Sequence, residues 1–354
     1  MPRSLRFLLP LAILLALAPA AHARLPAGFV GITSEDVFAG DEAYRSETLA
    51  DQRAVRVGLI RQVFDWSLIE TARGRYDFSE YDSYMLALAA NRMRVLPILF
   101  RPPRFQARRR SGTTCPPSSN ASFASFAQAV VRRYGPRGSL WRENPDVPKV
   151  PLGSYQIWNE PQLRQYWCNK PNAKQYVAML KTVGGAIKRA QRGAEIVTAG
   201  LPPSKLSGAV AFRKYIRQMY AAGAKRYFDT LAVNSYAQGA AQLGRLLDAV
   251  RGLMNERGDR RAKIWITELG WGDSGVRHRF IVGARGQAQR ISQSLALIDK
   301  RKKRYKLRGV VYYQWRDAEP YGGRDMWGFH TGLLRKDGSP KPAFNAFRSG
   351  VKKL

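Results

Sequence analysis

The feature that most constrains this chain is a regular alternation, from Phe29 onward, of short apolar runs with longer amphipathic stretches. Such alternation is typical of repeated β-α units around a parallel sheet. The runs are rich in β-branched residues, as expected for strands that are buried on both faces. We identify eight runs, at residues 29–32, 54–58, 95–100, 155–158, 195–199, 230–234, 264–267 and 310–314.

The stretches between these runs carry apolar residues at helical spacing. They predict helices over residues 79–91, 122–134, 173–191, 209–222, 241–257 and 285–303. Eight strands interleaved with helices in a chain of 354 residues predict an α/β fold that closes into a single-domain (β/α)8 TIM barrel over residues 24–354. An open doubly wound sheet is the alternative, but the chain lacks the Gly-rich phosphate turn typical of that fold.

Residues 1–23 have the features of a secretion signal. Arg3 and Arg6 precede an apolar stretch, and Ala21-His22-Ala23 matches a small-x-small cleavage site. The stretch is shorter than the roughly 20 residues that cross a bilayer, and no other segment of the chain approaches that length. We therefore expect a secreted, extracellular protein with no membrane span, and we expect it to be a monomer.

The cysteine and histidine content gives no sign of a metal site. The chain has two cysteines and three histidines, without paired metal-ligand spacing, and it carries no cofactor motif. We therefore expect neither metal nor cofactor. An oxidising compartment permits a Cys115–Cys168 disulfide, but the sequence alone leaves that pairing open.

The formal net charge of +33 favours polyanionic partners in general, such as nucleic acids, acidic polysaccharides or anionic membrane surfaces. Charge is the only feature that would suggest nucleic acid, so we expect no nucleic-acid partner. The basic cluster at residues 300–304 lies at a predicted helix end, where the helix dipole favours cations, and we interpret it as a solvated helix end rather than a dedicated binding patch.

Two apolar runs end in a glutamate beside aromatic residues. Glu160 follows the fourth run in Ile157-Trp158-Asn159-Glu160-Pro161, and Glu268 follows the seventh in Trp265-Ile266-Thr267-Glu268. Because barrel enzymes place their chemistry at the C-terminal strand ends, both carboxylates should face one cleft. A pair of this kind serves glycosidic cleavage, with one group donating a proton and the other attacking the sugar carbon. An ionised Glu268 would also raise the pKa of Glu160 and keep it protonated.

With these motifs, the chain resembles the clan A retaining glycoside hydrolases, (β/α)8 enzymes that include the families numbered 5 and 39. Asn159-Glu160-Pro161 is similar to the acid/base signature of strand four, and Thr267-Glu268 to the nucleophile of strand seven. Tyr312-Tyr313-Gln314-Trp315 resembles strand eight with its substrate-stacking tryptophan, and the resemblance extends over nearly the whole chain after residue 23. One departure is Asn234-Ser235-Tyr236, where many relatives carry a histidine.

The resemblance implies roles for further residues. Asn159 would bind the sugar 2-hydroxyl, Tyr236 would hold the nucleophile, and Trp315 would form the floor of the subsite. Arg61 is the candidate for the strand-two arginine near the nucleophile, with Arg56 as the competing choice. Among the other aromatic residues we expect Trp271 to line the cleft, with further candidates at Trp66, Trp158, Trp167 and Trp327.

Hydrolysis with retention of the anomeric configuration implies that the carboxyl groups of Glu160 and Glu268 are roughly 5 to 5.5 Å apart. The predicted function is therefore that of a secreted retaining glycoside hydrolase, with Glu160 as acid/base, Glu268 as nucleophile and a carbohydrate as partner. The alternative is a non-catalytic barrel that binds glycans or polyanions. A transglycosylase would share the same catalytic residues.

An arginine-rich loop follows the third run. Arg101, Arg104 and the three arginines at 108–110 should lie on the catalytic face. Because guanidinium groups pair with carboxylates and sulfates, one hypothesis is that the substrate is an anionic glycan. The alternative is a solvated loop in an arginine-rich protein.

Overall fold

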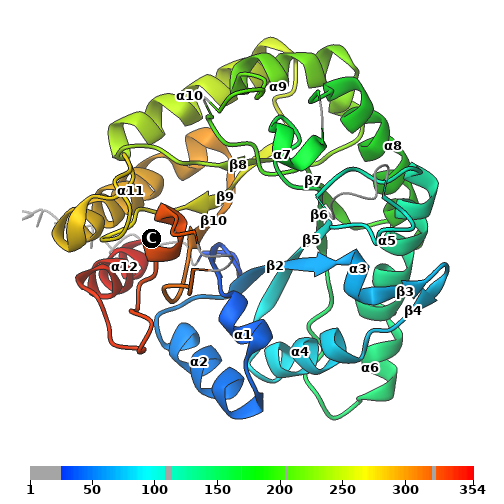
Figure 1. The fold of residues 1–354 in the computed structure, drawn as a ribbon, viewed down its shortest axis with the longest axis horizontal. Coiled ribbons are helices and arrows are strands. Elements are labelled where there is room, and N and C mark those ends of the chain that lie inside the picture. Colours follow the sequence, from blue (N-terminus) through cyan, green and yellow to red (C-terminus); the bar gives the residue numbers. More distant parts are fainter. Residues whose placement is uncertain (1–24, 108–113, 169, 205, 321–323) are drawn as a thin grey trace, which may run out of the picture.

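The computed structural model describes residues 25–107, 114–168, 170–204, 206–320 and 324–354. The expected secretion signal and the arginines at 108–110 lie outside the described residues. Eight parallel strands form a closed barrel in the order β1-β10-β9-β8-β7-β6-β5-β2, which confirms the predicted (β/α)8 fold. Figure 1 shows the strands as a ring at the centre with the helices around it.

The barrel strands are short and mostly buried. Their bounds are β1 Val30–Thr33, β2 Leu59–Asp65, β5 Arg94–Phe100, β6 Ser154–Ile157, β7 Glu195–Val197, β8 Thr230–Asn234, β9 Lys263–Leu269 and β10 Leu307–Tyr313. The barrel interior is filled by a separate apolar cluster to which six different strands each contribute one residue: Leu59, Leu96, Val197, Ala232, Trp265 and Val311. Packing of this kind makes the barrel a solid core, so ligands can reach only its ends.

The outer layer consists of the longer helices, which cover the strands with their apolar faces. They are α2 Glu42–Ala54, α4 Ser79–Ala90, α5 Asn120–Tyr134, α8 Ala173–Ala190, α9 Phe212–Ala221, α10 Ala240–Glu256, α11 Gly283–Tyr305 and α12 Pro342–Lys353. Several begin at side-chain caps, for example α5, where the Ser119 hydroxyl accepts from the amides of Ala121 and Ser122. No helix of the described residues combines the length and apolarity needed to span a bilayer.

The connections between the barrel strands and the longer helices contain further short helices and strands. They are α1 Glu35–Ala39, α3 Trp66–Ile69, α6 Ser139–Glu143, α7 Arg164–Trp167, the 3-10 turns η1 Ala224–Arg226 and η2 Trp327–His330, and a hairpin of β3 Glu70–Ala72 and β4 Arg75–Tyr76. The hairpin lies at the edge of the molecule beside α3 and α5 (Figure 1).

The second predicted strand, at residues 54–58, is wrong. Helix α2 continues to Ala54, and the chain then turns through Arg56, whose φ of 65° is left-handed, before β2 begins at Leu59. The alternating valines at 55 and 57 suggested a strand, whereas Arg61 and Gln62 interrupt the apolar pattern of the true one. The correction places Arg61 inside the barrel rather than after a strand.

A disulfide joins two connections at the C-terminal end of the strands. Cys115 lies in the connection after β5, and Cys168 ends the short helix α7 after β6, with their Cα atoms 5.0 Å apart. The structure thus forms the pair that the sequence left open. The bond closes a loop of 53 positions and restrains both connections beside the site described next.

Candidate active site

The two glutamates identified in the sequence meet at one end of the barrel. Glu268 belongs to β9, and Glu160 follows β6 by three residues. Both line a cleft of about 390 Å³, and Glu160 is 8% exposed and Glu268 7%. Two barrel strands, β7 and β8, lie between their strands, so the carboxylates approach one another from different parts of the rim.

The backbone around Glu160 is held in an unusual conformation. Trp158 and Glu160 both have positive φ, 74° and 45°, in the left-handed region that non-glycine residues avoid. Packing holds this turn in place: the Trp158 ring lies edge-on to Phe100 and donates from Nε1 to the Tyr166 carbonyl at 2.9 Å. Strain of this kind persists where the surrounding structure compensates for it, as it often does at functional sites.

Asn234, the last residue of β8, bridges the two glutamates. Its Nδ2 donates to Oε1 of Glu160 at 2.7 Å and to Oε1 of Glu268 at 2.9 Å. Because one nitrogen contacts both oxygens, these two oxygens can be no farther apart than the sum of the two distances. The Asn234 amide is itself oriented by Thr267, whose hydroxyl donates to Oδ1 at 2.8 Å.

Arg61 of β2 lies at the centre of a second set of contacts. Its Nη1 donates to Oε1 of Glu268 at 2.8 Å, its Nε to Gln156 at 2.8 Å, and its Nη2 to Oδ1 of Asn159 at 3.1 Å. The side chain is 3% exposed, so its charge is compensated mainly by Glu268. Arg56, the competing choice, lines a different cavity beside Gly28 and Gly58, at the N-terminal end of the strands.

Tyr236 holds the other oxygen of Glu268. Its hydroxyl donates to Oε2, so Arg61, Asn234 and Tyr236 together supply three donors to this carboxylate. Burial and the nearby negative charge of Glu268 raise the pKa of Tyr236 well above its usual range, which keeps the hydroxyl protonated and able to donate.

The environment of Glu160 favours its protonated form. Burial raises the pKa of Glu160 to about 8, and the negative charge of Glu268 adds to the rise. The hydrogen bond from Asn234 and the charge of Arg61 act in the opposite direction. Glu160 can therefore carry a proton near neutral pH, as a general acid must.

The predicted roles of Trp315 and Trp271 need correction, because neither side chain is among those that line the cleft. Trp315 is 1% exposed and packs against Phe344 of α12. Trp271 is fully buried and donates from Nε1 to the Ala237 carbonyl at 2.7 Å. Both residues come after their strands have ended, where the alternation of strand side chains no longer fixes their direction.

Other aromatic residues line the cleft instead. Trp327 contacts Tyr236 and Phe280 with ring centroids 4.9 Å apart in each case, and it stacks on His278 at 5.5 Å. Tyr313, the last residue of β10, completes this wall. Of the weaker candidates, Trp327 lies in the cleft, whereas Trp66, Trp158 and Trp167 are buried.

Sequence reasoning missed two polar residues of the cleft. Asn234 ends the sixth run and Glu35 follows the first, so the strand-end rule that identified Glu160 could have identified both. Glu35 lines the cleft. Loss of hydration in the surrounding protein raises the pKa of Glu35; the positive charge of Arg101 opposes this rise and the negative charge of Glu268 adds to it.

The cationic residues of the predicted loop are only partly in the cleft. Arg101 lines it, with a side chain that is 46% exposed and a long contact of 3.3 Å to Asp65. Arg279, from the connection after β9, also lines it. Arg104 is exposed but does not line it.

Within the described part of the chain, no group of three or more histidine, cysteine, aspartate or glutamate side chains is placed to hold a metal ion.

No protein-family model matches the sequence, and no curated protein matches it. Solved structures do share its fold. A family 39 glycoside hydrolase from the gut symbiont Bacteroides cellulosilyticus WH2 has a TM-score of 0.67 at 18% identity, over 91% of this chain and 63% of that one. A monomeric beta-xylosidase from Caulobacter crescentus CB15 has a TM-score of 0.68 at 15% identity, over 91% and 67%.

A GH39 enzyme from Xanthomonas axonopodis pv. citri has a TM-score of 0.66 at 17% identity, over 91% of this chain and 65% of that one. The chain thus spans 63 to 67% of the length of these three structures. At such low identities the likeness shows the fold alone. The chain therefore has the same (β/α)8 barrel fold as these glycoside hydrolases.

Proposed function

We propose that the protein is a retaining glycoside hydrolase in which Glu160 is the acid/base and Glu268 the nucleophile. The observation that carries the proposal is the Asn234 bridge: the two distances from its Nδ2 limit how far apart the contacted oxygens of Glu160 and Glu268 can be. This upper limit on the distance between the two oxygens is close to the carboxyl separation of roughly 5 to 5.5 Å in retaining enzymes. It is smaller than the separation of roughly 6.5 to 9.5 Å in inverting enzymes.

In the first step, the Glu160 carboxyl group donates its proton to the glycosidic oxygen while a Glu268 carboxylate oxygen attacks the anomeric carbon. The bond from that carbon to the leaving oxygen breaks, and a glycosyl ester forms on Glu268. In the second step, the Glu160 carboxylate takes a proton from water, the water oxygen attacks the same carbon, and the ester bond to Glu268 breaks. Two inversions give net retention.

The contacts around the pair suit these steps. Asn234 occupies Oε1 of Glu160, which leaves Oε2 to carry the proton. Arg61 and Tyr236 orient Glu268 and stabilise its charge before attack and after ester cleavage. Asn159 lines the cleft, and its carbonyl oxygen accepts from Arg61, so its amide nitrogen is the end that remains for a sugar hydroxyl.

We further propose that the substrate is an anionic glycan. Arg101 and Arg279 both line the cleft, from the connections after β5 and β9 respectively. Arg101 is half exposed and only loosely held by Asp65, so it is available to a substrate carboxylate or sulfate. Faster hydrolysis of neutral glycans than of matched acidic ones, with no response to ionic strength, would refute this assignment.

Export is proposed from the sequence of residues 1–23. Expression of the full chain in a secreting host should yield extracellular protein whose first residue is Arg24. Retention of the intact N-terminus inside the cell would contradict it.

The experiment that tests the proposed activity is a screen of the purified protein against neutral and acidic polysaccharides, with release of reducing ends as the readout. The Glu268→Gln variant is the blank. Glu319→Gln is the matched control, since Glu319 is an exposed acid after β10 that pairs only with Lys336 among the described residues. Activity that is lost in Glu268→Gln and kept in Glu319→Gln supports the proposal. Equal rates in Glu268→Gln and the native protein would overturn the role of Glu268, and release no faster than without protein would favour a non-catalytic binding protein.

A further inference from the structure

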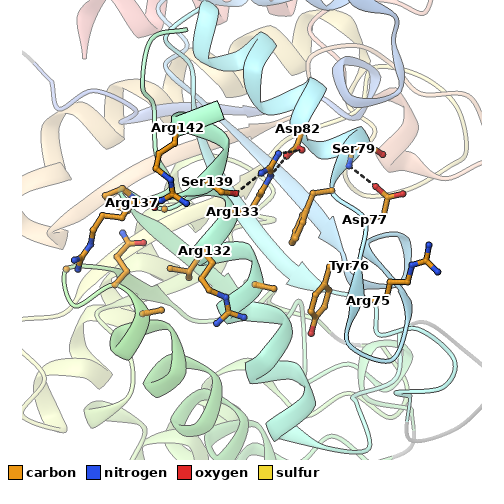
Figure 2. A pocket seen from close by; sticks show the side chains of 18 of the residues that line it. Arg75, Tyr76, Asp77, Ser79, Asp82, Arg132, Arg133, Arg137, Ser139 and Arg142 are labelled. Carbon is orange, nitrogen blue, oxygen red and sulfur yellow. Dashed lines mark hydrogen bonds and ion pairs between the residues drawn. The ribbon is translucent and has the colours of Figure 1, made fainter. Parts of the chain in front are cut away.

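A second cavity, of about 1350 Å³, lies in the outer helix layer. Its walls come from the hairpin of β3 and β4, the start of α4, the end of α5, the short helix α6 and the residues after α8. It shares no lining residue with the catalytic cleft. Figure 2 shows side chains from these separate elements facing one recess.

The recess, which we call the arginine groove, is strongly cationic. Six arginines line it: Arg75, Arg132, Arg133, Arg137, Arg142 and Arg192. Arg133 is neutralised by Asp82 at 2.6 Å and Glu143 at 2.7 Å. The other five are exposed, and none of them makes an ion pair with a described residue.

The groove offers few carboxylates to balance this charge. Asp82 is engaged by Arg133 and accepts a further hydrogen bond from Tyr134 at 2.8 Å. Asp77, the other lining acid, accepts from the backbone amide of Ser79 at 3.0 Å (Figure 2). The positive charge of the groove is therefore left for a ligand.

The basic end of α11 differs from the arginine groove, because three of its five cationic side chains have a carboxylate partner. Arg301 and Arg304 both contact Asp248, at 3.4 and 2.9 Å, and Lys302 contacts Asp299. The predicted interpretation of residues 300–304 as a helix end agrees with these contacts. Compared with that cluster, the arginine groove is distinguished by its missing counter-charges rather than by its arginine content.

Aromatic surface accompanies the charge. Tyr76 and Phe78 line the groove, are half-buried, and lie with ring centroids 6.2 Å apart and planes 26° from parallel. Arg142 is fixed against the same recess by a hydrogen bond from Nη1 to the Arg137 carbonyl at 2.8 Å. Flat rings beside guanidinium groups suit a sugar that carries an acidic substituent, because the ring packs on apolar C–H faces while the guanidinium pairs with the acid.

We propose that the arginine groove is a binding site for an acidic polysaccharide, separate from the catalytic cleft. Its volume exceeds the roughly 300 to 1,000 Å³ typical of sites for single small ligands, so it holds several sugar units. A recess between a hairpin and helices admits one flexible chain, whereas a DNA duplex presents a broad, rigid surface that would bridge over it. The groove would hold a long substrate or a cell-surface glycan without contributing to catalysis.

The test is binding of polygalacturonate, measured by isothermal titration calorimetry in the Glu268→Gln background so that the polymer stays intact. Replacing Arg132, Arg137 and Arg142 by Gln should weaken binding about tenfold, the combined effect of three exposed ion pairs. Binding should also weaken as salt is added, and dextran, a neutral polymer, should not bind.

The matched control replaces Lys174, Lys214 and Arg217 by Gln. These residues are exposed on α8 and α9, make no ion pair with described residues and line neither cavity. Equal weakening in the two triple variants would overturn the proposal, because net charge alone would then govern binding. Absence of polygalacturonate binding, or tighter groove-dependent binding of duplex DNA, would overturn it too. Since no turnover is measured, these results leave the proposed hydrolysis untouched.

Discussion

Removing the amide that joins the two glutamates should change the pH dependence of the reaction in a specific direction. In the proposed mechanism Glu160 acts as an acid only while protonated, so activity should fall as pH rises through its pKa. Asn234 donates to Glu160 and lowers that pKa, because the hydrogen bond stabilises the carboxylate. Asn234→Ala therefore raises the pKa of Glu160 further, and the alkaline limb of the pH–rate profile moves to higher pH.

The size of the effect follows from the kind of contact. A hydrogen bond to a charged group contributes about 1.5–3 kcal/mol. Since one pH unit corresponds to about 1.36 kcal/mol, the limb should move up by about one to two pH units. The same loss of orientation should lower kcat by about ten- to a hundredfold, because Asn234 also holds Glu268.

A second substitution perturbs Asn234 without replacing it. A Cβ on Gly200 would lie 2.1 Å from Oδ1 of Asn234, so Gly200→Ala must displace the amide. The alkaline limb of the pH–rate profile of Gly200→Ala should therefore also move to higher pH, as it does in Asn234→Ala. Gly193→Ala is the control, since nothing lies within 4 Å of its added Cβ.

The assay is kcat/KM against pH for the native protein and the three variants, on whichever polysaccharide the screen identifies. Circular dichroism would show that each variant is folded. An alkaline limb that stays at the native position in both Asn234→Ala and Gly200→Ala would refute the reasoning, because Asn234 would then have no influence on Glu160.

Three further predictions concern stability and substrate contact. The raised pKa of Glu160 means that its charged form destabilises the fold, so Glu160→Gln should raise Tm at pH 9 and leave it nearly unchanged at pH 4, below the unfolded-state pKa; a gain that is largest in acid would contradict this. Replacing Cys115 and Cys168 by Ser should lower the free energy of unfolding in urea by about 4 kcal/mol for a loop of this length, and an unchanged midpoint would refute it. Trp327→Ala should raise KM about tenfold with little change in Tm, whereas Trp315→Phe should lower Tm and leave KM unchanged. The reverse pattern would show that Trp315, and not Trp327, contacts the substrate.

The fold and the glutamate pair could be predicted because they depend on local patterns. Short apolar runs alternate with helical stretches, and a carboxylate directly after a run needs only the barrel closure to reach the mouth. For Glu160 and Glu268 no knowledge of distant contacts was required. Asn234 also ends a run, so the same rule places it at the mouth, but its hydrogen bonds to Glu160 and Glu268 join residues 74 and 34 positions apart and could not be predicted from local sequence.

The second strand was missed because two buried polar residues interrupt it. Arg61 and Gln62 stand in the middle of β2, where periodicity predicts apolar residues. Arg61 is tolerated there because Glu268, Gln156 and Asn159 satisfy its guanidinium. Polar residues whose hydrogen bonds are satisfied inside a barrel thus interrupt the apolar pattern from which a strand is predicted.

The tryptophans could not be assigned because they follow the strands. The direction of Trp315 depends on Phe344 of α12, which packs against it. Trp327 comes later, in the 3-10 turn η2, and enters the cleft by packing on His278 and Phe280. Only tertiary contacts distinguish Trp327 from Trp315, so the resemblance to a family pattern placed Trp315 in the cleft although Trp327 lines it.

The central claim is that Glu160 and Glu268 hydrolyse a glycosidic bond through a covalent intermediate on Glu268. Proton NMR of the first product released, recorded before mutarotation, tests it most directly. The product should carry the anomeric configuration of the substrate. A first product of opposite configuration would show direct attack by water and would contradict the role assigned to Glu268.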